Sequence, residues 1–192
     1  MSYLDSVTMP MQQAPDVSTR VTPKAKTMNI ALWILQMLWG VFFCFTGFGK
    51  IMCYRADVWD HTLRQPVAWF HAVPQGLFVF IGVCEFLGGV GLILPVMTGV
   101  KPKLTAFAAI GLTLIMILAA IFHIVRGEFS FFVPMNLVLG GVAALIAYER
   151  LIVCPIVSRP ISALRMVMGI ATLGVLALVG FLPIWYQVTH NH

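Results

Sequence analysis

The feature that most constrains this chain is its series of long apolar runs. Of the 192 residues, 60% are hydrophobic and 10% are charged, against roughly 25% charged in an average soluble domain. Each run is near or above the ~20 residues that a helix needs to cross a bilayer. The five runs are Ile30–Cys53, Gly76–Met97, Leu104–Val125, Pro134–Cys154 and Ala163–Val188. Because backbone groups in lipid need internal hydrogen bonds, these runs predict a bundle of membrane-spanning helices.

The chain divides into three parts by composition. Residues 1–27 are polar and contain Pro10, Pro15 and Pro23 without an apolar run, so they predict a flexible tail and not a signal peptide or a span. Residues 28–155 hold the first four apolar runs, and residues 156–192 hold the fifth run and a short tail. The expected fold is all-α: a polytopic membrane bundle of four helices plus a fifth, C-terminal transmembrane helix.

The distribution of lysine and arginine indicates the orientation of the bundle. With five spans, the N-terminal tail and the second and fourth loops share one side of the membrane, which holds Arg20, Lys24, Lys26, Lys101, Lys103, Arg150, Arg159 and Arg165. The other side holds Lys50, Arg55, Arg64 and Arg126. The positive-inside rule therefore predicts an internal N terminus and an external C terminus. We interpret the net charge of +5 as this topology signal and expect no nucleic-acid partner.

The longest connection between runs, Tyr54–Gln75, mixes aromatic, aliphatic and charged residues. Such a mixture is compatible with a short amphipathic or re-entrant element that caps the bundle at the membrane interface. A plain extracellular loop is the alternative, and the sequence leaves both open. The connection also contains Asp57, Asp60, His61 and His71, but their spacing is not that of a compact metal site, so no metal is expected.

Glu85 is the one charged residue in the run Gly76–Met97. An ionisable side chain inside a membrane helix costs at least ~2.5–3.5 kcal/mol, so such residues usually have a partner or a function. Lys50, with its long side chain, is the expected partner. Glu85 could fix the register of two helices through a buried ion pair. Alternatively, it could bind a ligand or take up and release a proton. Both interpretations remain open at this stage.

Several polar residues share helix faces with small side chains, which is where membrane helices approach one another closely. The faces are those of Lys50 in the first run, Glu85 in the second, His123 in the third and Asn136 in the fourth. Alone, His123 would be an interfacial residue and Asn136 a contact between helices. Their similar depth predicts that all four meet in a polar cavity in the outer half of the membrane, with Glu85 at its floor and Arg126 at its rim.

A family resemblance becomes visible at these same positions. It rests on the segment Phe42–Lys50, the segment Glu85–Leu92, His123 with Arg126-Gly127-Glu128, Asn136, and Tyr148-Glu149-Arg150. Over about residues 34–150 the chain resembles the DoxX-like family of small bacterial and archaeal membrane proteins. The resemblance implies a four-helix membrane bundle in a prokaryotic cytoplasmic membrane. It also implies a possible quinone ligand, since some relatives are linked to quinone-coupled sulfur oxidation or to complexes that handle oxidative and thiol stress.

Three classes of function follow from these observations. The first is a redox accessory protein whose cavity binds a quinone-like or other small amphipathic molecule. The second is a small proton-linked transporter that uses Glu85, and the third is a scaffold subunit, as a homo-oligomer or within a larger membrane complex. The sequence has no haem, flavin or iron–sulfur motif, so no cofactor is evident and a self-sufficient enzyme is not expected. We favour the accessory binding role.

Overall fold

The computed structural model describes residues 23–65, 67–98, 101, 103–153, 167 and 171. Every regular element in this part of the chain is helical, which confirms the all-α prediction. The elements are α1 (Pro23–Met52), α2 (Ala56–Leu63), η1 (Ala68–Ala72), α3 (Gln75–Thr98), α4 (Lys103–Val125), α5 (Phe132–Tyr148) and η2 (Glu149–Val153). The short η1 is a 3₁₀-helix, and η2 continues α5 as one turn of π-helix.

Four of the predicted spans are present as helices long and apolar enough to cross a membrane. They are Thr27–Met52, Gln75–Pro95, Lys103–Val125 and Phe132–Val153. The molecule is therefore a polytopic membrane protein. The predicted fifth span, Ala163–Val188, lies outside the described residues, as do residues 1–22 of the predicted tail. α1 begins at Pro23 and thus includes the last residues of the range assigned to that tail.

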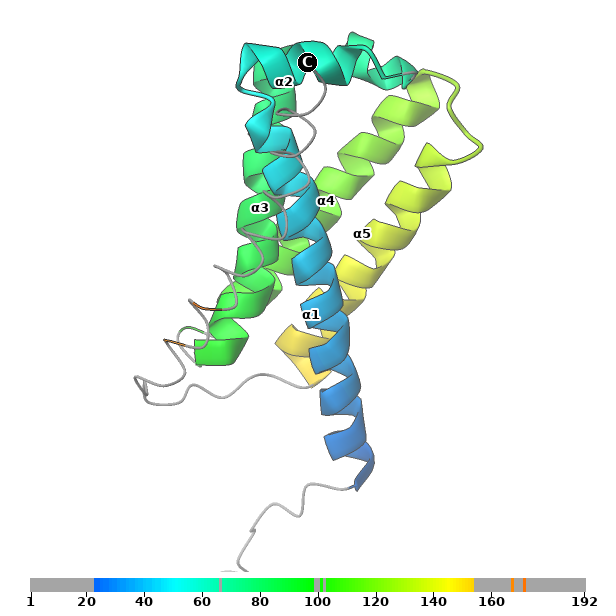
Figure 1. Ribbon diagram of the computed structural model, residues 1–192. Coiled ribbons are helices and arrows are strands. Elements are labelled where there is room, and N and C mark those ends of the chain that lie inside the picture. Colours follow the sequence, from blue (N-terminus) through cyan, green and yellow to red (C-terminus); the bar gives the residue numbers. More distant parts are fainter. Residues whose placement is uncertain are drawn as a thin grey trace, which may run out of the picture.

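The four long helices are arranged as two pairs, α1 with α3 and α4 with α5 (Figure 1). Glycines allow the first pair to pack backbone against backbone. A Cβ atom at Gly82 would lie 2.6 Å from the Cβ of Lys50, and one at Gly89 would lie 2.6 Å from the carbonyl oxygen of Gly40. The predicted small-residue face of α3 is therefore a buried helix contact. It brings Glu85, which lies on the same face, up against α1.

A core of apolar side chains joins the two pairs. Phe43 of α1, Leu92 of α3, Leu112 of α4 and Ile146 of α5 are at most 1% exposed and belong to one cluster. The indole Nε1 of Trp39 also donates a hydrogen bond to the carbonyl oxygen of Leu139 across the bundle, at 3.1 Å. The outer surfaces of the helices carry many exposed large apolar side chains, as expected where lipid is the solvent.

The connection between the first and second spans folds into the capping element that the sequence left open. α2 and the segment after it lie across one end of the bundle (Figure 1). Val58 of α2 and Val73 after η1 are buried in a second apolar cluster with Phe78 of α3, and Trp59 and Trp69 pack against it. The segment is thus a packed cap and not a plain solvent-exposed loop. It holds Trp69 over the space between the two helix pairs.

Candidate functional site

Glu85 and Lys50 form the predicted contact between the second and first spans. The Nζ atom of Lys50 lies 2.5 Å from Oε2 of Glu85, and the hydroxyl of Thr46 donates a second hydrogen bond to the same oxygen at 3.2 Å. The Glu85 side chain is 4% exposed and that of Lys50 is 20% exposed. A buried carboxylate with an ammonium partner avoids most of the cost of an isolated charge in lipid. The other carboxylate oxygen, Oε1, receives no hydrogen bond from the described residues.

His123 lies at the end of α4 and has a carboxylate partner that sequence reasoning missed. Its Nδ1 is 2.5 Å from Oε2 of Glu128, and the Nε of Arg126 donates to Oε1 of the same residue at 2.9 Å. Burial raises the pKa of Glu128, but the hydrogen bonds from His123 and Arg126 outweigh it, so this pKa lies below its ordinary value. Glu128 is therefore ionised at neutral pH.

The end of α4 explains how Glu128 reaches His123. Gly127 has a φ of +75°, a conformation that suits glycine. The backbone amide of Glu128 donates a hydrogen bond to the carbonyl oxygen of His123, and the backbone amide of Gly127 donates one to the carbonyl oxygen of Ile124. This pair of hydrogen bonds is the Schellman motif. It folds the chain after the helix back, so that Glu128 lies beside the last turn of α4. The Arg-Gly-Glu sequence after an apolar helix was therefore the signal that could have located Glu128.

Aromatic rings hold the imidazole of His123 in place. The ring of Phe132 stacks on it at a centroid distance of 4.6 Å and an interplanar angle of 11°. The ring of Trp69 meets it edge-on at 5.8 Å, and Phe122 does so at 5.3 Å. His123 therefore contacts the cap, α4 and α5 at once, and its orientation is set by packing as well as by Glu128.

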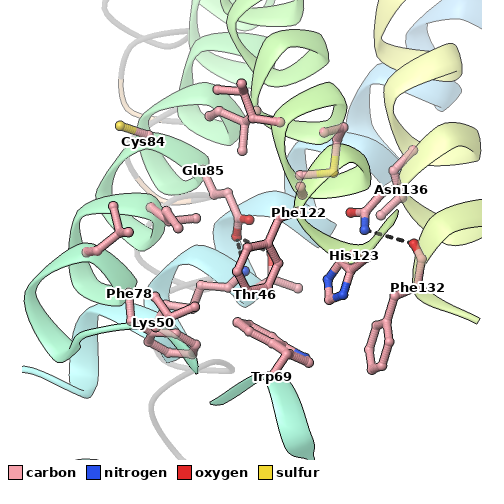
Figure 2. Close-up of a pocket in the computed structure, with 18 of the residues that line it drawn as sticks. Thr46, Lys50, Trp69, Phe78, Cys84, Glu85, Phe122, His123, Phe132 and Asn136 are labelled. Atoms are coloured by element: carbon pink, nitrogen blue, oxygen red, sulfur yellow. Dashed lines mark hydrogen bonds and ion pairs between the residues drawn. The ribbon is translucent and has the colours of Figure 1, made fainter. Parts of the chain in front are cut away.

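Asn136 of α5 is buried close to this group. Its Nδ2 donates a hydrogen bond to the carbonyl oxygen of Phe132, one turn earlier in the helix, at 2.8 Å. That bond leaves the amide oxygen Oδ1 without a hydrogen bond among the described residues. Figure 2 shows Glu85, Thr46 and Lys50 on one side of the view and His123, Asn136 and Phe132 on the other, with Trp69 from the cap.

A pocket of about 450 Å³ lies between the two helix pairs beneath the cap. Four of the five predicted site residues line it: Lys50, Glu85, His123 and Asn136. Most of its other lining residues are apolar or aromatic, among them Phe43, Trp69, Phe78, Met116 and Leu139. The polar groups that were expected to form a polar cavity are thus a few groups within a largely apolar one.

Arg126 does not line this pocket. Its side chain is 28% exposed, and its Nε pairs with Glu128. Its guanidinium lies 5.5 Å from the centroid of Phe122, which is a lining residue. Arg126 therefore contacts the wall of the pocket from outside. Within the described ranges, no cluster of three or more His, Cys, Asp and Glu residues could hold a metal ion.

Comparison with known proteins gives a family but no individual relative. The model of the DoxX-like family matches residues 34–146. That range covers more than half of the chain, including α2, η1, α3 and α4 and every residue that lines the pocket. No curated protein and no solved structure matches the chain.

Proposed function

The chain belongs to the DoxX-like family, and we propose that it is an accessory membrane protein that binds a small amphipathic molecule in the pocket beneath its cap. The observation that carries this proposal is the pocket itself: about 450 Å³, mostly apolar, and containing Glu85, Lys50, His123 and Asn136. Binding sites for small molecules are commonly apolar cavities in which a few polar groups fix the orientation of the ligand.

The buried ion pair supports a binding role over a purely architectural one. Tight packing of α1 on α3 is already supplied by Gly82 and Gly89, so the pair is not needed to bring the helices together. Ionisable groups within spans commonly mark a substrate path or a binding site. Both Glu85 and Lys50 also line the pocket, so the polar end of a ligand can replace the water that these groups would otherwise bind.

The ligand reaches the pocket from the lipid. Leu77 and Phe80 of α3 and Leu118 of α4 line it, yet they are 50%, 62% and 58% exposed on the outside of the bundle. In a membrane that outer surface faces acyl chains. A molecule dissolved in the bilayer can therefore enter between α3 and α4 with its apolar part still in contact with lipid. A quinone-like molecule belongs to this class, in line with what the family resemblance implies.

We place the protein in a prokaryotic cytoplasmic membrane with its cap on the external side. The Lys and Arg distribution supports this orientation. The end of the bundle opposite the cap holds Lys24, Lys26, Lys101, Lys103 and Arg150, and the cap end holds Lys50, Arg55, Arg64 and Arg126. The pocket then lies in the outer half of the membrane. The protein holds its ligand for a partner or a larger complex that carries out the chemistry.

Filling the pocket tests the proposal. Ala119 lines the pocket, whereas Ala144 is exposed on the surface of α5. We expect native mass spectrometry of the protein, purified in mild detergent, to detect a bound amphipathic molecule in the wild type and in Ala144→Phe. Ala119→Phe should lose it, because the phenyl ring takes its volume. If Ala119→Phe retained the same species at the same occupancy, the pocket would not be the binding site.

A further inference from the structure

The contact between Glu128 and His123 determines which ring nitrogen carries the proton. Glu128 is ionised and accepts a hydrogen bond from Arg126. An ionised carboxylate has no proton to donate, so Nδ1 of His123 must be the donor in their 2.5 Å contact. In a neutral imidazole one nitrogen is protonated and the other is an acceptor. With the proton on Nδ1, the acceptor is Nε2.

Nε2 is the nitrogen left for a ligand. The His123 side chain is 6% exposed and lines the pocket, and Nε2 has no hydrogen-bond partner among the described residues. The stacked ring of Phe132 and the edge contact with Trp69 oppose a flip of the imidazole. Nε2 is not one of the fully buried polar atoms that lack a partner among the described residues, so it is accessible from the pocket. A ligand that displaces water from Nε2 without donating a hydrogen bond to it leaves the nitrogen unpaired, which is costly.

Asn136 gives the same side of the pocket a second acceptor. Its Nδ2 is used by the carbonyl oxygen of Phe132, which assigns the amide orientation and leaves Oδ1 available. Both His123 and Asn136 line the pocket, and they lie near each other in Figure 2. The α4–α5 side of the pocket therefore presents two acceptors, while the α1–α3 side presents the Lys50 ammonium together with the Glu85 carboxylate.

We infer that the pocket selects an amphipathic molecule with a hydroxyl head group, which donates a hydrogen bond to Nε2 of His123, and that Glu128 is the positioning residue that sets this preference. The inference rests on the proposed function and deepens it, because it names the chemical class of the ligand. An ether or ketone of the same shape offers only acceptors to His123 and Asn136. Such an analogue leaves both groups unpaired and binds more weakly. Among quinone-like molecules, the pocket therefore selects the hydroxyl-bearing quinol form.

Replacement of Glu128 by glutamine changes which nitrogen of His123 donates a hydrogen bond and which accepts one. The glutamine amide can donate a hydrogen bond to Nδ1 as well as accept one from it. The imidazole proton is then free to occupy Nε2, which becomes a donor. Glu128→Gln is therefore expected to lose the preference for a hydroxyl while the pocket stays intact. Asp57→Asn, which makes the same change in an exposed carboxylate paired with Arg55, is the matched control.

The test uses 1-naphthol and its methyl ether, 1-methoxynaphthalene, as probes. Their binding to the full chain in lipid nanodiscs is measured by equilibrium dialysis, and binding to Ala119→Phe is subtracted to remove partition into lipid. We expect the wild type and Asp57→Asn to favour the naphthol by about tenfold, the order of one net hydrogen bond. Glu128→Gln should bring the two affinities within about twofold. Nitrogen-15 NMR of His123 should show the proton on Nδ1 in the wild type and a shift towards Nε2 in the variant.

The inference alone would be overturned by equal binding of the two probes to the wild type, or by an unchanged preference in Glu128→Gln. A His123 protonated on Nε2 in the wild type would do the same. If neither probe bound the wild type more than Ala119→Phe, the proposed function would be contradicted and the inference would fall with it.

Discussion

At the scale of single residues, the pair of Lys50 and Glu85 shows how far sequence reasoning reaches. One carboxylate in an apolar run needs a partner, and the geometry of the neighbouring span identified Lys50 as that partner. Glu128 was not identified, because its role depends on the left-handed conformation of Gly127 and on the turn that follows α4. The roles of Trp69 and Phe132 around His123 depend on contacts between distant segments, which no local pattern encodes.

The energetics of the buried pair can be measured with a double-mutant cycle. Lys50→Met leaves Glu85 buried without its ammonium partner, and breaking a buried pair in this way costs about 3–5 kcal/mol. We expect a large fall in thermal stability in detergent for Lys50→Met, and recovery of most of it when Glu85→Gln is added. The exposed pair of Arg55 and Asp57, at 2.7 Å, is the control, because an exposed pair contributes about 0–1 kcal/mol.

Equal losses in Lys50→Met and Arg55→Met would contradict the buried pairing of Lys50 with Glu85. A double variant no more stable than Lys50→Met would show that the loss comes from packing and not from the unpaired carboxylate.

At the scale of the elements, the spans and their inward faces could be predicted from the sequence. Hydrophobic length located the first four helices, and the small residues of α3 indicated the face that packs on α1. The cap was left open between two alternatives, because the 22-residue connection has no periodicity strong enough to decide between a loop and short helices. Its structure depends on burying Val58 and Val73 against Phe78 of α3, a tertiary effect.

The close approach of α1 and α3 predicts a specific sensitivity to added methyl groups. A Cβ at Gly89 would lie within 2.8 Å of three atoms of α1, whereas one at Gly111 of α4 would meet nothing within 4 Å. We expect Gly89→Ala to destabilise the bundle by about 1–3 kcal/mol through overpacking. Gly111→Ala should be neutral or slightly stabilising, because alanine favours the helix. Thermal unfolding in detergent provides the comparison.

If Gly89→Ala were as stable as Gly111→Ala, the close approach of the α1 and α3 backbones at Gly89 would be contradicted. Glu85 would then lie farther from α1 than the ion pair with Lys50 requires.

At the scale of the whole molecule, two tightly packed helix pairs under a cap leave a pocket between them. Composition alone predicted the membrane bundle, since only 10% of the residues are charged. The convergence of polar groups from four helices was predicted as a cavity, but its apolar character was not. The size and lining of a pocket depend on how far the helix pairs separate, and no property of the individual spans determines that separation.

Ligand binding beneath the cap is best tested by an experimental structure of the full chain in a lipid nanodisc made with native lipid extract. We expect non-protein density beneath the cap, between Glu85 and His123, with an apolar part that leads towards Leu77 and Leu118. Lys50 should remain within hydrogen-bonding distance of Glu85. A bundle in which side chains close this space, or in which Glu85 faces lipid away from Lys50, would contradict it.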